Sequence, residues 1–180
     1  MDIAEKPATK YLHLPLGKNP PDEINVVVEI PAGSRNKYEY DKKNDVFHLD
    51  RALHSAMYYP GDYGFAPQTL AHDGDPLDVL VLVVEPTFSG CLIAARPVGM
   101  LEMIDSGKED EKIIAVPVGE PIFEEVHSYT DLYPHLLRKI SNFFEIYKAL
   151  EGKTTKIGSW RDAAAAKRVL TESHERFHSI

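Results

Sequence analysis

The sequence has few of the features that mark secreted, membrane-spanning or nucleic-acid-binding proteins. It contains a single cysteine, Cys91, so an intramolecular disulfide is excluded and a reducing compartment is favoured. Its longest apolar run, Val79 to Val84, is far shorter than the roughly 20 residues of a membrane-spanning helix, and the N-terminus lacks a signal-peptide pattern. The formal net charge of −8 disfavours nonspecific binding to nucleic acid or anionic membranes. We therefore expect a cytoplasmic protein without nucleic-acid or membrane partners.

Short apolar segments separated by proline and glycine fill the chain up to about residue 120, and their composition is typical of strands. The period then becomes helical. The spacing of apolar residues from Leu136 to Leu150 predicts an amphipathic helix, with Pro134 in its first turn. Ser159 followed by Asp162 resembles a capping box and predicts a second helix that extends to about Arg176. The expected strands are Ile24–Ile30, Asn36–Asp41, Val46–Asp50, Val79–Val84, Cys91–Leu101 and Lys112–Val118.

Strands followed by helices indicate an α+β fold that is mainly β, rather than alternating βαβ units. A length of 180 residues is typical of one domain with one core. We therefore expect residues 1–180 to form a single domain. Several short strands without long crossovers predict a small closed or partly closed barrel, with the two C-terminal helices packed outside it.

The segment DGDPLD carries the strongest local signal for chemistry. Asp73, Asp75 and Asp78 stand immediately before the most apolar strand, and Gly74 and Pro76 between them favour a turn. Three carboxylates gathered at a strand entrance repel one another unless cations are present. Magnesium binds such hard oxygen ligands and usually keeps several waters. The residues therefore suggest a Mg²⁺ site, although a solvated acidic turn has the same pattern.

Two familiar motifs compete for the same aspartates. An EF-hand loop starting at Asp73 requires glycine at its sixth position and glutamate at its twelfth, where this chain has Asp78 and Val84. An aspartyl-phosphate phosphatase of the DxDx(T/V) type would use Asp73 and Asp75, but Leu77 replaces the expected threonine or valine and its βαβ scaffold is not indicated. The EF-hand is excluded, and the phosphatase stays a weaker alternative.

A second acidic group lies in the loop MIDSGKEDEK between two predicted strands. Asp105 and Asp110 are candidate ligands there, and Lys112 follows them at the start of a strand. An ordinary charged hairpin loop would have the same composition. Its occurrence together with DGDPLD favours a functional role.

Charged residues also interrupt the strands nearer the N-terminus. The period of two in NKYEYD predicts Lys37, Glu39 and Asp41 on one face, opposite Tyr38 and Tyr40. Other charged residues among apolar neighbours are Glu29 in its strand and Arg51 at the end of VFHLDR. Such a residue usually has a partner or ligand, whereas an edge-strand charge facing water is the alternative in each case.

Tyrosines complete the candidate set. Tyr59 and Tyr63 lie in a loop rich in proline and glycine, where a phenol group can donate a hydrogen bond to an anion. Tyr147 and Lys148 lie beside the apolar stripe of the predicted long helix. Packing anchors and a solvated lysine are the simpler explanations for these four residues.

Two literal motif matches carry no function. HERFH, from His174 to His178, matches the HExxH zinc motif but ends two residues before the C-terminus and has no evident third ligand. GKT at Gly152–Thr154 resembles the end of a Walker A loop, but Tyr147 stands at the first glycine position and the segment follows a helix. We expect neither a zinc site nor a P-loop.

Taken together, these fragments resemble the soluble family I inorganic pyrophosphatases. The resemblance extends from about residue 12 to the final helix, and DGDPLD before an apolar strand is its most specific part. The length is similar to that of the short prokaryotic form. The matching segments are EIP with Glu29, KYE with Lys37 and Glu39, DR with Arg51, YYPGDYG with Tyr59 and Tyr63, DGDPLD, MIDSGKEDEK, and YK with Tyr147 and Lys148.

The resemblance implies a five-stranded OB-like closed barrel with outer helices, a homohexamer, and three to four Mg²⁺ ions per subunit, with Mn²⁺ or other divalent ions as alternatives. It assigns Asp75 as the general base. Asp73, Asp78 and Asp110 are implied ligands of the first metal; Asp78 is shared with a second, Asp105 and Asp110 hold a third, and Glu29 contributes to a fourth. The implied substrate-binding set is Lys37, Arg51, Tyr63, Lys112, Tyr147 and Lys148, with Glu39 and Tyr59 as supporting residues.

Two residues depart from the family pattern. Ser106 stands where an acidic residue is expected after Asp105, which puts one contact near the metal in doubt. Asp62 stands where asparagine is expected, beside Tyr63. Neither change removes an implied ligand.

The implied activity is Mg²⁺-dependent hydrolysis of inorganic diphosphate to two phosphates by direct in-line attack of a metal-activated hydroxide, without a phosphoenzyme. A nucleic-acid or oligosaccharide binding module is the alternative of a different class, because OB-like barrels often bind such ligands. The acidic charge and the lack of an aromatic platform with basic neighbours count against it.

Overall fold

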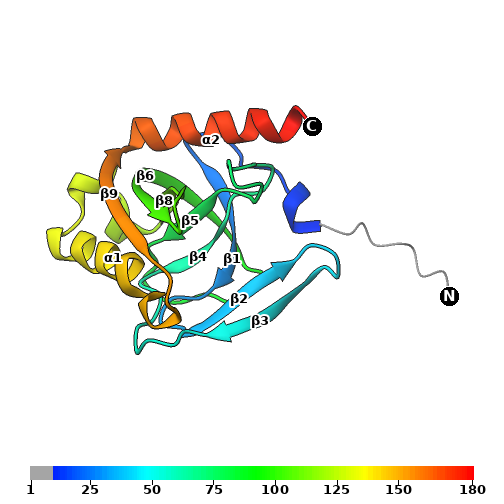
Figure 1. The fold of residues 1–180 in the computed structure, drawn as a ribbon. Helices are drawn as coiled ribbons and strands as arrows, with labels where there is room; N and C mark the ends of the chain where they lie inside the picture. Colours follow the sequence, from blue (N-terminus) through cyan, green and yellow to red (C-terminus); the bar gives the residue numbers. More distant parts are fainter. Residues whose placement is uncertain (1–9) are drawn as a thin grey trace.

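A sheet that closes on itself forms the centre of the computed structural model, which describes residues 10–180 (Figure 1). All neighbouring strands in this ring are antiparallel except β5 and β8, which run parallel. The expected five-stranded closed barrel is confirmed. Its strands, in the order in which they pair, are β1 (Ile24–Ile30), β4 (Asp62–Phe65), β5 (Asp78–Val81), β8 (Lys112–Pro117) and β6 (Leu92–Asp105), which pairs again with β1.

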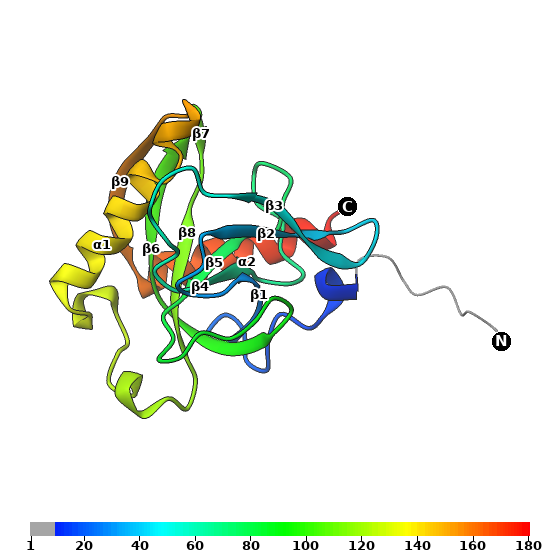
Figure 2. The ribbon, with the colours of Figure 1, turned by 90° about the horizontal axis from the view of Figure 1, so that it is seen from below.

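Four further strands extend or flank the barrel. The short β7 (Lys108–Glu109) and β9 (Thr155–Asp162) both pair with β6. Strands β2 (Asn36–Asp41) and β3 (Val46–Ala52) form a separate two-stranded sheet. In Figures 1 and 2 this hairpin lies on the opposite side of the barrel from α2. It therefore projects from the barrel rather than contributing to it.

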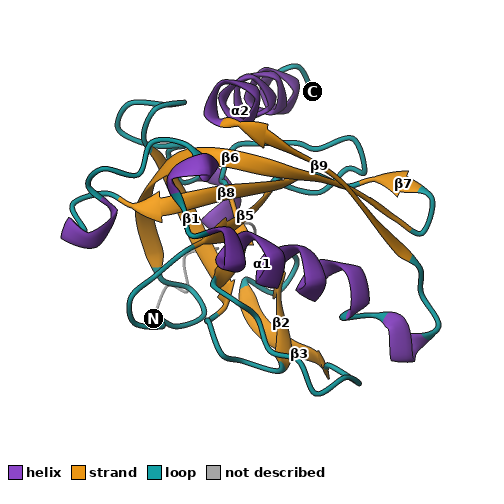
Figure 3. Cartoon of the chain, turned by 90° about the vertical axis from the view of Figure 1, so that its left-hand side faces the viewer, coloured by secondary structure: helices purple, strands orange, loops and turns teal. Residues whose placement is uncertain are grey.

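Two α-helices pack on the outside of the sheet, as expected. Helix α1 (Pro134–Ile146) lies against β9, and α2 (Ala163–His178) lies against β6 (Figure 3). Pro134 begins α1, where its missing N–H costs no hydrogen bond. Four single turns of 3-10 helix complete the described chain: η1 (Lys10–His13), η2 (Pro121–Phe123), η3 (Tyr129–Asp131) and η4 (Ala149–Glu151).

Apolar side chains fill the barrel and the interfaces with both helices. The largest buried cluster joins barrel residues such as Leu80 and Ile114 to Phe143 and Phe144 of α1, and a second joins Val79 and other strand residues to α2. Neither α1, α2 nor the shorter helices within residues 10–180 combine the length and hydropathy that crossing a bilayer requires.

Strand β4 is absent from the sequence prediction. Its four residues are all buried, and Gly64 lies so close to β1 that a β-carbon there would be 1.8 Å from the carbonyl oxygen of Val27. Pro60 and Gly61 directly before it gave the segment the composition of a loop. The strand forms because barrel closure brings β1 and β5 to its two edges.

The start of the second helix was predicted three residues too early. Ser159 and Trp160 belong to β9, and Asp162 is the N-cap, with its Oδ1 accepting the N–H of Ala165 at 2.9 Å. Trp160 packs against Tyr129 and donates a hydrogen bond to Ser141. Pairing of β9 with β6 outweighs the cap pattern at Ser159.

Other boundaries moved by a few residues. Helix α1 ends at Ile146, and Leu150 belongs to η4. Strand β5 stops at Val81, before the exposed Val84, while β6 continues four residues beyond Leu101 to Asp105. The longer β6 places Asp105 at the end of the barrel where β5 and β8 begin.

Candidate active site

A cavity of about 320 Å³ lies at one end of the barrel, between the barrel strands, the β2–β3 hairpin and the segment that follows α1. Most of its wall is polar or charged. Of the fourteen candidate residues from the sequence, all except Arg51 line this single cavity. Those that do are Glu29, Lys37, Glu39, Tyr59, Tyr63, Asp73, Asp75, Asp78, Asp105, Asp110, Lys112, Tyr147 and Lys148.

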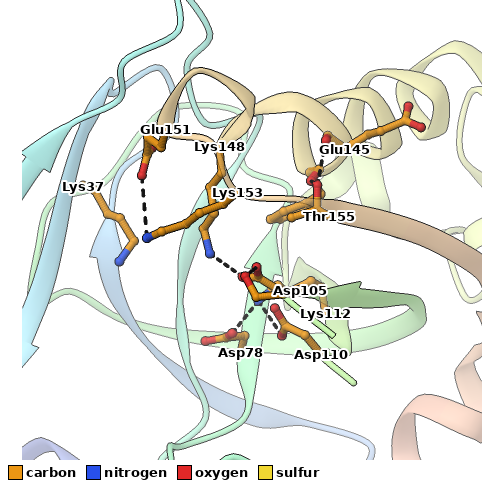
Figure 4. Close-up of polar contacts among 12 residues, drawn as sticks. Lys37, Asp78, Asp105, Asp110, Lys112, Glu145, Lys148, Glu151, Lys153 and Thr155 are labelled. Carbon is orange, nitrogen blue, oxygen red and sulfur yellow. Dashed lines mark hydrogen bonds and ion pairs between the residues drawn. The ribbon is translucent and has the colours of Figure 1, made fainter. Parts of the chain in front are cut away.

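Lys112 contacts three other residues of the cavity lining. Its side chain is 3% exposed, and its Nζ lies 2.6 Å from Asp78 Oδ2 and 2.7 Å from Asp110 Oδ1 (Figure 4). The hydroxyl of Tyr63 is 2.9 Å from the same atom. Burial alone would lower the pKa of this ammonium group, but the two carboxylates raise it above its ordinary value. Lys112 therefore stays charged and holds carboxylates from two strand ends together.

Glu29 enters the cavity from β1. Its Oε1 accepts the backbone N–H of Tyr40 at 2.8 Å, which ties β1 to the β2–β3 hairpin. Burial, with a contribution from the nearby Asp78, raises the pKa of Glu29 to about 7. A carboxyl group in such surroundings gains from a neighbouring cation.

The DGDPLD turn has the geometry that its glycine and proline imply. Gly74 has φ +92°, a conformation that L side chains rarely adopt, and Asp73 Oδ1 accepts the backbone N–H of Asp75 at 3.0 Å. The Asp75 side chain is 67% exposed at the cavity entrance, and its Oδ1 lies 2.7 Å from Lys42 Nζ. Lys42 is a cavity residue that the sequence analysis missed, because nothing in a hairpin turn signals contact with a residue 33 positions later.

Asp105, Tyr147 and Lys148 form the wall on the α1 side. Lys148 forms an ion pair with Asp105, whose pKa it lowers against the opposing effect of burial. Tyr147 is buried next to this pair, and burial raises its pKa. Ser106, the first departure from the family pattern, donates its hydroxyl to Asp105 Oδ1 at 3.0 Å. It thus supplies a neutral donor where an acidic neighbour was expected.

The β2–β3 hairpin places its charged residues less regularly than strict alternation predicts. Lys37 pairs with Glu39 on the cavity side, but Asp41 instead accepts hydrogen bonds within its own turn. Tyr38 and Tyr40 also line the cavity, so the two faces are not separated as expected. Asp41 is the last residue of β2, so its carboxylate accepts N–H groups of the following turn, whereas the register shift adds Asp50 to β3 and leaves β2 continuous.

Arg51 lies beside the cavity rather than in its lining. It is the register partner of Lys37, and its guanidinium forms ion pairs with Asp50 and with Glu151 of η4. No pattern in the sequence connects Arg51 with Glu151, which lies 100 residues later in the chain.

Asp62, the second residue that departs from the family pattern, is completely buried and joins two loops by hydrogen bonds. Its Oδ1 accepts the N–H of Ala32 at 2.8 Å, and its Oδ2 accepts both the N–H and the hydroxyl of Thr87. Backbone N–H groups at both oxygens match a carboxylate, which accepts at each of them. The residue supports the loop that carries Tyr59 and Tyr63 without entering the cavity.

The electrostatic balance of the cavity is acidic. Seven carboxyl groups and four lysines line it, and no cysteine or histidine does so within residues 10–180. The lysines hold most of these carboxylates, and the described residues contain no group of three acidic, histidine or cysteine side chains already arranged as a metal cage. The donor set consists of hard carboxylate oxygens, which suit Mg²⁺ or a similar divalent ion.

The literal motif matches remain outside this site. On α2, His174 hydrogen-bonds the carbonyl of Gln68, and its ring packs edge-on against His178. Gly152 has φ +71° at the end of η4, where it closes the 3-10 turn. The geometry at both places is that of ordinary helix packing and termination.

Comparison with known proteins identifies relatives across nearly the whole chain. The family model described as inorganic pyrophosphatase matches residues 26–178. An inorganic pyrophosphatase of Halalkalibacterium halodurans is 54% identical over 157 residues, which cover 87% of this chain and 96% of the relative. One from Synechocystis is 55% identical over 83% of this chain and 88% of the relative. The crystal structure of inorganic pyrophosphatase from Thermus thermophilus aligns with a TM-score of 0.91 at 40% identity, covering 96% of this chain and 99% of that one.

Proposed function

The chain belongs to the inorganic pyrophosphatase family, and from this premise we propose that its cavity hydrolyses inorganic diphosphate to two phosphates. One observation carries the assignment of the site. Carboxylates from β1, β5, β6 and the loops between them meet four lysines and five tyrosines in a single cavity. Carboxylate donors next to basic and phenolic groups suit an anion with two phosphoryl groups that binds together with divalent cations.

The acidic excess supports a requirement for metal ions. Three more carboxyl groups than lysines line the cavity, so a diphosphate anion would meet net repulsion there without added cations. We propose that three to four Mg²⁺ ions bind, held by Asp73, Asp78, Asp105, Asp110 and Glu29, and that Mn²⁺ can replace them. When bound, these ions would lower the pKa of a coordinated water and neutralise phosphoryl oxygens.

Asp75 is the proposed general base. It is the most exposed of the cavity aspartates whose ion pairs are described, and its turn sets it at the entrance, where water has access. Within residues 10–180, the ion pair of its carboxylate is with Lys42 in the hairpin turn. A carboxylate in this position can accept a proton from the attacking water while its neighbours hold the substrate.

The basic residues and tyrosines would bind the two phosphoryl groups. Lys37, Lys112 and Lys148 reach the cavity from three separate elements, β2, β8 and the segment after α1. Their ammonium groups are held by carboxylates, which pre-orients them before substrate arrives. Tyr63 and Tyr147 would donate hydrogen bonds, Arg51 would act from the edge of the cavity, and Tyr59 and Glu39 would support this set.

We further propose that residues 1–180 act as one domain, that the protein is cytoplasmic, and that it assembles as a homohexamer. The packing of α1 and α2 on the barrel supports the first proposal, and the single cysteine supports the second. Large apolar side chains on the surface, among them Ile122, Tyr133 and Leu150, support self-association. Sedimentation equilibrium of the purified protein tests the assembly.

The proposed activity is tested by phosphate release. Purified protein stripped of metal should release two phosphates per diphosphate only after Mg²⁺ is added, with no release from a phosphomonoester. In ¹⁸O-labelled water, a single turnover should place label in phosphate without a trapped aspartyl-phosphate. If no phosphate is released, a binding module is favoured. A phosphorylated aspartate would favour the DxDx(T/V) phosphatase instead.

A further inference from the structure

An ion pair outside the cavity lining joins two segments that the proposed function requires. Arg51 Nη2, at the end of β3, lies 2.8 Å from Glu151 Oε1 in η4. The Glu151 side chain is only 6% exposed, so its carboxylate is nearly removed from water. Its other cationic neighbour, Lys153, is 3.9 Å away and half exposed. Burial of a carboxylate is costly without a cation, and Arg51 is the cation that offsets that cost.

The hydrogen bonding of this pair is incomplete. Arg51 Nε and Nη2 and Glu151 Oε2 are buried and have no aligned hydrogen-bond partner within residues 10–180. The pair is therefore held by charge rather than by a two-point fork, although a guanidinium and a carboxylate can form one. Two guanidinium nitrogens are thus buried without an aligned acceptor, and the charge of Glu151 holds the guanidinium in place.

Glu151 also lies close to residues of the cavity wall. Its backbone N–H donates to the carbonyl of Lys148 at 3.0 Å, and Lys148 pairs with Asp105 inside the cavity (Figure 4). At the other end of the pair, Arg51 stands opposite Lys37, which lines the cavity from β2. The Arg51–Glu151 contact thus links the projecting hairpin to the segment that carries Tyr147 and Lys148.

We propose that Glu151 is a positioning residue, which fixes the Arg51 guanidinium at the cavity edge so that its positive charge attracts a phosphoryl group of diphosphate. This inference rests on the proposed function, because it concerns the same site. Glu151 does not contact the substrate. It acts through Arg51, whose long side chain would otherwise lose orientation and weaken substrate binding.

A double-mutant cycle tests this dependence. Glu151→Gln keeps the size of the side chain but removes its charge, and we expect the KM for diphosphate to rise about tenfold, with kcat changed far less. In an Arg51→Ala background, the same Glu151→Gln change should leave KM unaltered, since the residue through which it acts is absent. Steady-state phosphate release in Mg²⁺ measures all four proteins.

Glu145→Gln is the matched control. Glu145 precedes Glu151 by six residues and is exposed on α1, with its side chain pointing away from the cavity in Figure 4. This variant loses the same charge and should keep the wild-type KM. If Glu151→Gln does not fold, as judged by its melting curve, Glu151→Asp takes its place in the cycle, because it keeps the charge on a shorter side chain.

The outcomes separate the two proposals. A wild-type protein that releases no phosphate overturns the proposed function and this inference with it. If the wild type is active, an unchanged KM in Glu151→Gln overturns the inference alone. The same conclusion follows if the KM change persists in the Arg51→Ala background, or if only melting temperature and kcat fall, since these results indicate a purely structural role.

Discussion

The inner wall of the cavity and its outer rim hold similar residues in different ways. In the inner wall, which we define as Tyr63, Asp78, Asp110 and Lys112, a lysine side chain that is 3% exposed contacts all three partners. In the outer rim, defined as Lys42, Asp73 and Asp75, the lysine and Asp75 side chains are 43% and 67% exposed. Attraction between charges is strong where water is excluded and weak where it is not.

This difference suggests a division of work within one site. The inner wall is fixed before any ligand arrives, because its charges hold one another in place. The rim has side chains in contact with solvent, which suits a group that must exchange a proton with water. Substitutions in the two regions should therefore change different measured quantities.

The largest expected effect is at the rim. Asp75→Asn removes the proposed general base and should lower kcat by about 10²- to 10⁴-fold, the usual contribution of a positioned base. Metal affinity should change little, because Asp75 is not among the implied metal ligands and the asparagine keeps the size of its side chain. Steady-state kinetics and Mn²⁺ titration on the same preparation measure both quantities. A variant that keeps near-normal turnover would remove Asp75 from the mechanism.

A substitution in the inner wall should lower metal affinity and activity together, whereas Asp75→Asn in the rim should lower activity alone. Asp78→Asn removes an implied metal ligand, and we expect metal affinity to fall by at least about 10- to 100-fold, with activity falling alongside it. Raising the Mg²⁺ concentration should restore part of the activity of Asp78→Asn and none of that of Asp75→Asn. The opposite pattern of rescue would reverse the roles assigned to these residues.

The smallest expected effect concerns stability and compares two lysines. Lys112→Met leaves two partly buried carboxylates without their cation and should lower the free energy of unfolding by about 1–3 kcal/mol. Lys42→Met breaks only an exposed pair and should change it by less than about 0.5 kcal/mol. Denaturant unfolding without added metal measures both. Equal losses would show that the wall is no more tightly held than the rim.

Local pattern was enough to predict much of the fold and to suggest the candidate residues, whereas resemblance to a family grouped them into one site. Strand β1 was predicted with its observed bounds, because its apolar run ends in distinct turn residues, and DGDPLD gave both a turn and a carboxylate cluster. Strands β4 and β9 were missed because tertiary pairing decides them. Pro60 and Gly61 gave β4 the composition of a loop, and the cap pattern at Ser159 predicted a helix where β9 pairs with β6.

Contacts between distant segments set the limit at the site itself. The pairs Lys42–Asp75 and Arg51–Glu151 each join residues far apart in the chain, and no periodicity or motif connects them. Both contacts join the β2–β3 hairpin to segments outside the barrel strands. The sequence indicated a barrel, but the five-stranded closed form and the roles of individual ligands came from resemblance to a family rather than from spacing.

The central claim is that an acidic cavity accepts a diphosphate anion only when divalent cations accompany it. Calorimetric titration with imidodiphosphate, a diphosphate analogue whose bridging nitrogen resists hydrolysis, measures this directly in Mg²⁺ and in a metal-free chelating buffer. We predict measurable binding with Mg²⁺ and an affinity weaker by at least about 10-fold without it, the scale of coupling between two linked ligands. Equal affinity in the two buffers would contradict the account.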